Sequence, residues 1–136
     1  MADIRKVTDD FSVAPQIGPA DAATAASMGF VKLINNRPDG ETPDQPPSAE
    51  MEKAARAAGL DYVHIPFAGR PTPEQARAVL EAAEAADGPV LAFCRSGTRS
   101  ITAWSLGQAQ AGRRPASELL ALAADAGYDL SPVLGG

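Results

Sequence analysis

The segment from Pro89 to Trp104, PVLAFCRSGTRSITAW, constrains the fold of this chain more than any other. Four successive apolar residues, 90–93, are typical of a strand buried on both faces, as in a parallel sheet. A helical pattern starts near Thr98, after a short loop that contains Gly97. This order of strand, glycine loop and helix predicts an α/β unit, in which backbone N–H groups and the positive end of the helix dipole face a bound anion.

The only cysteine of the chain, Cys94, lies at the start of that loop. Arg95 and Arg99 follow it closely, and both a helix N-terminus and nearby cations favour the nucleophilic thiolate form. A lone cysteine after an apolar strand is more often a buried packing residue. Packing requires neither the two arginines nor the glycine, so the pattern favours a catalytic cysteine. With one cysteine there is no internal disulfide, which fits a reducing compartment.

Length and charge narrow the class of protein. We expect residues 1–136 to form a single domain around one core. A net charge of -5 argues against general nucleic-acid binding, because no basic stripe is available to neutralise phosphates. The sequence has neither a long apolar run nor a signal peptide pattern, so we expect a soluble, cytoplasmic protein that contacts no membrane. We also expect no cofactor and no metal.

The rest of the chain alternates between strand and helix patterns. This alternation predicts an α/β fold of three layers, with a mainly parallel central sheet of about four to five strands flanked by helices. Strands are expected at residues 11–14, 31–35, 62–67 and 90–93, and helices at residues 19–28, 48–59, 72–86, 98–110 and 117–126. Residues 1–10 are expected to be a frayed lead-in, and residues 128–136 a short tail.

Two other loops are expected at the same sheet edge as Cys94, because parallel crossovers bring the loops after the strands together. Residues 36–47, NRPDGETPDQPP, carry Arg37 and Asp39, and residues 68–71, AGRP, carry Arg70. We predict that these three side chains help to bind substrate in a shallow pocket. Turn chemistry alone explains the Pro-Asp-Gly step of the first loop equally well. The only histidine, His64, lies within a strand pattern, which favours a structural, hydrogen-bonded role over that of a general base.

The loop CRSGTRS resembles the active-site loop of the cysteine-based phosphatases and rhodaneses. The segments SVAPQIG, VKLINNRPDGE and VHIPF extend the likeness to the bacterial phosphatase-like domain that is also found fused to beta-lactamase-like hydrolases. This resemblance covers the chain from about residue 11 to about residue 112. It implies a fold like that of dual-specificity phosphatases, and some members of the family are described as sulfurtransferases.

Two departures from the phosphatase pattern favour sulfur transfer. Tyrosine-type phosphatases have five residues between the cysteine and the arginine, whereas Cys94 and Arg99 are separated by four, as in rhodaneses. The loop before the helix capped by Thr72 also lacks the aspartate that such phosphatases usually use as a general acid. The leading hypothesis is therefore a rhodanese-type sulfurtransferase. In this reaction Cys94 takes a sulfur atom from thiosulfate or a small persulfide, and passes it to an external acceptor thiol.

Each residue of the loop receives a role under this hypothesis. Arg95 and Arg99 bind the anionic end of the donor and stabilise the persulfide charge. Ser100 hydrogen-bonds the thiolate, which places it with Cys94 and Arg99 among the catalytic residues. Backbone N–H groups for the cradle come from Ser96, Gly97 and Thr98.

Two alternatives remain open. A phosphatase would hydrolyse phosphomonoesters through a Cys94 thiophosphate, with Asp39 or Glu41 as the acid. A binding module would hold an anion without turnover, and would tolerate the loss of the Cys94 thiol. The expected partners are a small anionic sulfur donor or phosphoester and an acceptor thiol. The fused members of the family add a persulfide-oxidising metallo-hydrolase to this set.

Overall fold

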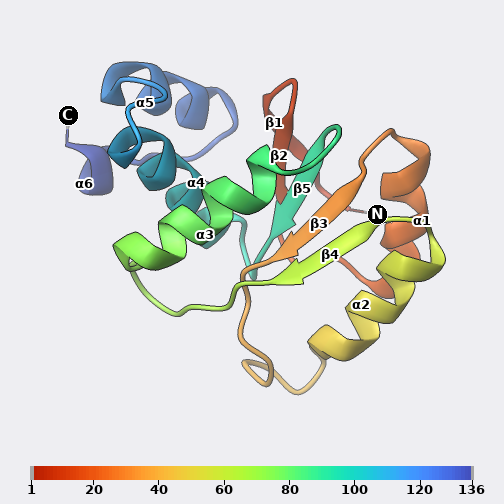
Figure 1. The fold of residues 1–136 in the computed structure, drawn as a ribbon. Helices are drawn as coiled ribbons and strands as arrows, with labels where there is room; N and C mark the ends of the chain where they lie inside the picture. Colours follow the sequence, from red (N-terminus) through yellow and green to blue (C-terminus); the bar gives the residue numbers. More distant parts are fainter. Residues whose placement is uncertain (1, 136) are drawn as a thin grey trace.

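A computed structural model describes residues 2–135, which form one five-stranded sheet with helices on both faces (Figure 1). The strand order is β1-β2-β5-β3-β4. β2, β5, β3 and β4 run parallel, and β1 pairs antiparallel with β2. The predicted α/β fold with a mainly parallel sheet is confirmed. The strands are β1 (Arg5–Thr8), β2 (Phe11–Ala14), β3 (Lys32–Asn35), β4 (Asp61–His64) and β5 (Val90–Phe93).

The helices form the two outer layers of the molecule. Figure 1 shows α1 and α2 on one face of the sheet, with α3, α4 and α5 on the other. Their bounds are α1 (Pro19–Ser27), α2 (Ser48–Ala57), α3 (Pro73–Glu84), α4 (Thr98–Gln110), α5 (Ala116–Asp125) and α6 (Ser131–Leu134). None of the helices within residues 2–135 has the length and apolar character needed to cross a membrane.

The central strand β5 explains why its sequence is an unbroken apolar run. Leu91 and Phe93 pack into the core under α1 and α2. Val90 and Ala92 point to the opposite face, into the core under α3, α4 and α5. Because successive side chains alternate between two covered faces, every position of β5 is buried.

The chain termini differ from what the sequence predicts. The expectation of a frayed lead-in is wrong for residues 5–8, which form the edge strand β1. Only Val7 of this strand is buried, so a short edge strand with one inward side chain has almost no sequence pattern of its own. Its conformation comes from pairing with β2. The predicted tail likewise contains the short helix α6.

Trp104 of α4 belongs to the core. It is 3% exposed and stacks on Phe11, with the ring centroids 4.9 Å apart and the planes 7° from parallel. Offset stacking of two large rings stabilises the contact between α4 and β2 beyond the burial of their surface. Trp104 is therefore a packing residue that fixes α4, and with it the loop that precedes α4, against the sheet.

The parallel strands end level with one another, which brings their following loops together. Ala14 and Asn35 are both paired with Phe93 in the sheet. Just beyond, the Cys94 N–H donates to the carbonyl of Ala14 at 3.4 Å, and the Asn36 N–H donates to the carbonyl of Phe93 at 2.9 Å. The loops after β2, β3 and β5 therefore begin at a common edge, where open α/β sheets bind their ligands.

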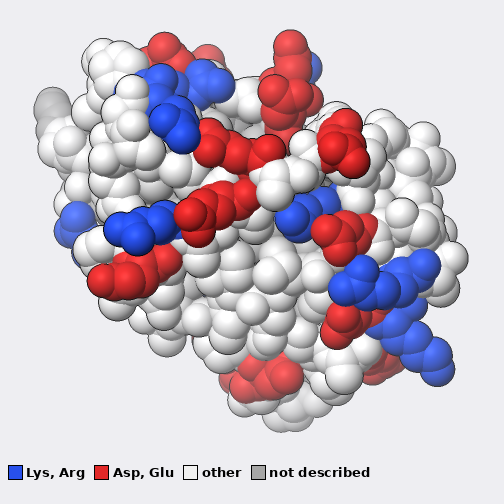
Figure 2. Space-filling model, viewed as in Figure 1, with Lys and Arg blue, Asp and Glu red and all other residues white. Residues whose placement is uncertain are grey.

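Charged side chains are interspersed on the face shown in Figure 2. Basic and acidic groups alternate there. Several exposed charged residues of the molecule form ion pairs, such as Arg113 with Glu84 at 2.8 Å. Exposed pairs of this kind contribute little to stability. They leave the face in view with no continuous basic stripe.

Candidate active site

Cys94 lies at the end of β5, beneath the loop that leads into α4. Its side chain is fully buried, and its Sγ accepts a hydrogen bond from the Gly97 N–H at 3.1 Å. Gly97 is the N-cap residue of α4. A backbone N–H donor and the positive end of a helix both stabilise a thiolate over a thiol. This part of the predicted cradle is present in the structure.

Gly97 fits this loop because it has no side chain. Its φ is 90°, in the left-handed region that favours glycine. A Cβ atom built at this position would overlap the hydroxyl of Tyr128. The turn that points the Gly97 N–H at the sulfur therefore depends on glycine for both its backbone conformation and its space.

Arg99 lies beside Cys94 and is held by Glu41, a pairing that the sequence did not predict. Both of its terminal nitrogens donate to Glu41, each at 2.8 Å, and one also donates to the carbonyl of Phe67 at 3.1 Å. The pKa of Arg99 is raised, chiefly by the bonds to Glu41 and in part by the negative charge of Cys94. The guanidinium thus has a fixed orientation next to the sulfur.

Glu41 joins two arginines. Besides Arg99, it accepts a hydrogen bond from Nε of Arg37 at 2.8 Å. The bond from Arg99 is the main cause that lowers the pKa of Glu41 from 4.5 to about 2. At neutral pH Glu41 is an ionised carboxylate, which can accept hydrogen bonds but has no proton to donate. Its position suits a positioning residue and does not suit the general acid that a phosphatase would require.

Arg37 is buried inside the loop that follows β3. It is 3% exposed, and a second bond from its guanidinium reaches Oε1 of Gln16 at 3.1 Å. Its carbonyl lies 2.8 Å from Nε2 of His64. His64 therefore has a hydrogen-bonded place in the fold, in keeping with the structural role predicted for it. The geometry of Arg37 is that of a brace between loops at the carboxyl edge of the sheet.

Asp39 is bonded to the start of α2. Its Oδ1 accepts the backbone N–H of Ser48 at 2.8 Å, at the first residue of that helix. The structure gives this carboxylate a contact typical of a helix N-terminus, where the orphan N–H groups need acceptors. Its predicted role in substrate binding remains a prediction.

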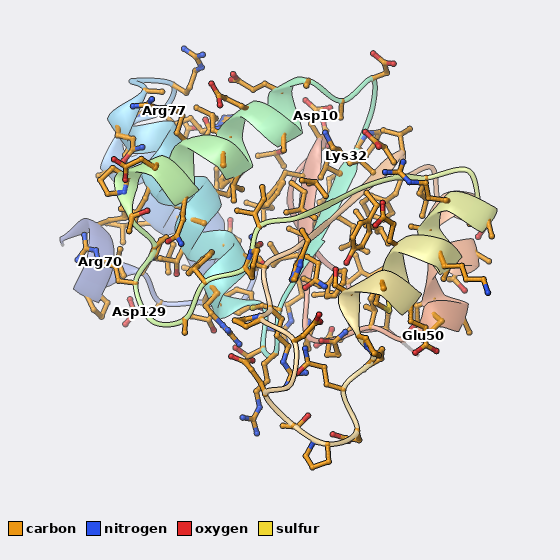
Figure 3. All side chains as sticks on the ribbon, turned by 60° about the horizontal axis from the view of Figure 1, so that its bottom comes forward. Asp10, Lys32, Glu50, Arg70, Arg77 and Asp129 are labelled. Carbon is orange, nitrogen blue, oxygen red and sulfur yellow. The ribbon has the colours of Figure 1, made fainter. Side chains whose placement is uncertain are left out.

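Arg95 is exposed at the mouth of the site. It borders a shallow cavity of about 230 Å³, which is lined in addition by Gln16, Arg37, Thr42, Asp44, Gln45 and Pro46. The cavity thus joins the cysteine loop, through Arg95, with the loop after β3, but Cys94 does not line it. Arg70 does not line it. Figure 3 shows Arg70 on the side of the view that carries Asp129. The carbonyl bonded by Arg99 belongs to Phe67, the residue just before the predicted loop 68–71.

The hydroxyl groups of the cysteine loop are engaged with one another or are unpaired. Oγ of Ser96 donates to Oγ1 of Thr98 at 3.0 Å. Ser100 is fully buried, and among residues 2–135 its Oγ has no hydrogen-bond partner. The bond from Ser100 to the sulfur that the sequence suggested is therefore not formed in this structure.

Sequence reasoning did not assign Tyr128 to the site. Its hydroxyl donates to the carbonyl of Ser96 at 2.9 Å, from the segment that follows α5. Nothing in the local pattern around Tyr128 indicates such a contact, because the two residues are 32 positions apart.

A larger cavity, of about 600 Å³, lies at the opposite edge of the sheet around Phe11, Gly88 and Gln108, and it contains none of the predicted site residues.

The fold and the loop together define the class of protein. A cysteine at the end of a central parallel strand, with an arginine from the first turn of the next helix beside it, is the arrangement of a cysteine-phosphatase-like protein. The chain belongs to the family of phosphatase-like domains of beta-lactamase hydrolase-like proteins, whose family model matches residues 3–111.

Named relatives agree with this assignment. The chain is 39% identical over 127 residues to a beta-lactamase hydrolase-like protein of Agrobacterium fabrum, and 34% identical over 125 residues to one of Xylella fastidiosa strain Temecula1. These alignments cover 92% and 91% of this chain. The chain spans only 29% of the length of each relative.

Solved structures show the same fold. The structure is similar to that of a presumed phosphatase from Neisseria meningitidis Z2491, with a TM-score of 0.85 and 32% identity, covering 96% of this chain and 93% of that one. It is also similar to Tk-PTP in its active form, with a TM-score of 0.65 and 19% identity, covering 88% of this chain and 80% of that one. At such low identity the second likeness shows the fold alone. The fold like that of dual-specificity phosphatases, expected from the resemblance, is confirmed.

Proposed function

We propose that this domain is a cysteine-dependent sulfurtransferase. In the first step the Cys94 thiolate attacks the outer sulfur of a donor such as thiosulfate or a small persulfide. A new S–S bond forms at Cys94 while the donor's S–S bond breaks, and sulfite or a thiolate leaves with the electron pair. In the second step an external thiol, as its thiolate, attacks the outer sulfur of the Cys94 persulfide and takes it, which restores the Cys94 thiolate.

The observation that carries the proposal is the state of the two candidate acids. Glu41, with its pKa near 2, is already ionised and bonded to Arg99, and Asp39 is bonded to the start of α2. When a phosphate ester of an ordinary alcohol is cleaved, the leaving alkoxide needs a proton from such an acid. Sulfite and thiolates are stable anions that leave without one. Three features of the site support this reaction: the Cys94 nucleophile, the Gly97 N–H at its sulfur and the fixed guanidinium of Arg99.

The contact between Arg99 and Glu41 supports the same reaction through charge. A phosphate dianion needs several donors and cations to hold its oxygens. Here the single negative charge of Glu41 is shared between Arg99 and Arg37, so it neutralises Arg99 only in part. A persulfide carries a single negative charge on one sulfur atom, which the Gly97 N–H and a partly neutralised guanidinium suit better.

Phosphomonoester hydrolysis through a Cys94 thiophosphate is the second candidate. The comparisons favour it over sulfur transfer, because the family model and the similar structures are described as phosphatases or phosphatase-like. An aryl phosphate, whose phenolate leaves readily, is the substrate least dependent on a general acid. It is therefore the fair test of this reaction.

An acceptor and a partner enzyme complete the proposal. Cys94 is the only cysteine, so the thiol that discharges the persulfide comes from another molecule. The relatives are more than three times as long as the aligned segment and carry the name beta-lactamase hydrolase-like. We propose on this basis that the natural acceptor thiol, once it carries the sulfur as a persulfide, is the substrate of a persulfide-oxidising metallo-hydrolase.

The intact mass of the protein tests these reactions directly. Wild-type protein and Cys94→Ser are incubated with thiosulfate or with glutathione persulfide, and in parallel with an aryl phosphate. A gain of one sulfur on the wild type alone, lost after addition of a thiol, is the expected result. Release of phosphate that depends on Cys94, with no gain of sulfur, would overturn sulfur transfer in favour of the phosphatase. Activity of either kind that survives Cys94→Ser would overturn both.

A further inference from the structure

A continuous hydrogen-bonded path links Tyr128 to the sulfur of Cys94. The Tyr128 hydroxyl donates to the carbonyl of Ser96 at 2.9 Å. The N–H of the same peptide group, which belongs to Gly97, donates to Sγ of Cys94 at 3.1 Å. Both polar ends of the Ser96–Gly97 peptide are thus engaged, one by the tyrosine and the other by the sulfur.

Tyr128 is held in place for this contact from two sides. Its backbone N–H donates to the carbonyl of Ala123 at 2.8 Å, at the end of α5. The guanidinium of Arg5 lies over its ring, 5.5 Å from the centroid, and also donates to the carbonyl of Ala126 at 3.1 Å. The backbone of Tyr128 is thus fixed at the end of α5, and its ring cannot swing away without breaking the contact with Arg5 of β1.

The approach of the hydroxyl to the loop is unusually close. A Cβ atom at Gly97 would overlap the Tyr128 hydroxyl, so the loop has a glycine where the tyrosine lies against it. The pKa of Tyr128 is raised, chiefly by burial and in part by the negative charge of Cys94. The phenol therefore keeps its proton at neutral pH. It is therefore a hydrogen-bond donor under the conditions in which Cys94 reacts.

We propose that Tyr128 is a positioning residue for the nucleophile, which acts on Cys94 through the Ser96–Gly97 peptide. Donation to the Ser96 carbonyl fixes the plane of that peptide, so that its N–H points at the sulfur. It also polarises the peptide, which makes the N–H a stronger donor to the thiolate. The inference rests on the proposed function only in taking Cys94 as the nucleophile. It applies equally to sulfur transfer and to phosphate hydrolysis.

The residue lies outside the part of the chain that the family model matches, which ends at residue 111. The segment that supplies it, α5 and the turn after it, packs on α4 and β1. The C-terminal segment thus has a function at the site besides covering the sheet.

The test is a titration of the Cys94 thiolate by its ultraviolet absorbance, with each protein measured against its own Cys94→Ser background. Tyr128→Phe keeps the ring and its contact with Arg5 but removes the donor. We expect the midpoint of the titration to move to higher pH by about half a unit to one unit, the size expected for loss of one neutral hydrogen bond. Tyr62→Phe is the matched control, because the Tyr62 hydroxyl bonds Ser48 and Asn35 and should leave the midpoint unchanged.

A second variant makes the test independent of any loss of stability. A tyrosine with a single ring fluorine at position 128 is a stronger donor in the same place while its phenol is protonated, so the midpoint should then move to lower pH. Arg5 and the other charged or titratable groups around the loop stay unchanged in both variants. These other groups are Arg37, Glu41, Asp44, His64, Arg95 and Arg99.

Two results would overturn the inference. One is a midpoint within about a tenth of a unit of wild type in Tyr128→Phe, and the other is a shift of the same sign in the phenylalanine and fluorotyrosine variants. Neither depends on a substrate. Failure of the proposed sulfur transfer would appear instead as an absent mass gain in a protein whose thiolate still titrates as expected.

Discussion

Glu41 and Arg99 form a two-pronged ion pair, in which both oxygens of the carboxylate accept hydrogen bonds of 2.8 Å from the guanidinium. The two residues are 58 positions apart in the chain. This pair decides the direction in which the arginine faces, and hence how the site presents positive charge to the sulfur of Cys94. A paired fork of this kind has a defined geometry that a lysine could not reproduce.

Replacing Glu41 by Gln should slow the chemistry without removing the nucleophile. The variant loses the ionic character of both bonds to Arg99. Hydrogen bonds to charged groups contribute about 1.5–3 kcal/mol. We therefore expect sulfur loading of Cys94 to slow by roughly 10- to 100-fold. The rate of mass gain with thiosulfate gives the measurement. Glu52→Gln is the control, since Glu52 pairs with Arg56 on the exposed face of α2. An unchanged loading rate in Glu41→Gln would show that the pair has no part in catalysis.

The same carboxylate should give the fold a recognisable dependence on acid. The pKa of Glu41 is about 2 in the folded protein and 4.5 ordinarily, so its ionic bonds favour the folded state at pH values above 4.5. That stabilisation is lost as the pH falls from 4.5 toward 2. Thermal unfolding of wild type and Glu41→Gln across this range should show a difference in Tm that is largest near neutrality and shrinks with acid. A difference that stays constant down to the lowest pH would contradict the assignment.

Gly97→Ala should be far more damaging than an equivalent change elsewhere. An alanine there meets both the left-handed φ of 90° and the Tyr128 hydroxyl, and strained backbone alone costs about 1–3 kcal/mol. Gly29 is the matched control, because its φ is 100° and its Cβ position is open. Chemical denaturation should show a greater loss of stability for Gly97→Ala than for Gly29→Ala. Adding Tyr128→Phe should recover part of the stability lost in Gly97→Ala and none of that lost in Gly29→Ala. Equal losses of stability at both glycines would disprove the close contact between Gly97 and Tyr128.

Asp39→Ala separates a structural carboxylate from one that binds substrate. Loss of an acceptor at a helix N-terminus costs roughly 0.5–2 kcal/mol, so the variant should unfold at a lower denaturant concentration. Because the Asp39 carboxylate is bonded to the start of α2, its loss should leave the rate of sulfur loading within about twofold of wild type, as for substitutions away from a site. A loading rate reduced tenfold or more in a stable protein would restore Asp39 to the substrate-binding residues.

Much of the fold follows from the sequence because its signals are local. The helix α4 begins at Thr98 and ends at Gln110, as its pattern predicts, and Thr72 caps α3 through a bond from the Gln75 N–H at 3.1 Å. Glycines, prolines and capping residues act within a few positions of one another, so they are visible in a single sequence. β1 has no such signal, since its backbone is fixed by a neighbouring strand.

The site is predictable only in part, because its supporting contacts are distant in the chain. Cys94, Gly97 and Arg99 occupy one short loop, and the loop itself indicates their chemistry. The partner that orients Arg99 and the tyrosine that bonds Ser96 come from other elements. Ser100 shows the converse: its place next to Arg99 suggests a bond to the sulfur, but the first turn of α4 turns its side chain into a buried position without a partner among residues 2–135.

The place of β5 in the sheet has a consequence for the order in which the molecule forms. β5 is the last of the five strands along the chain, yet it lies between β2 and β3, which do not pair with each other. Until residues 90–93 are inserted, the sheet exists only as two separate strand pairs, each too small to be stable in water. Folding must therefore wait for contacts between distant segments, which is slow relative to local folding. A chain interrupted before β5 therefore has neither Cys94 nor a continuous sheet.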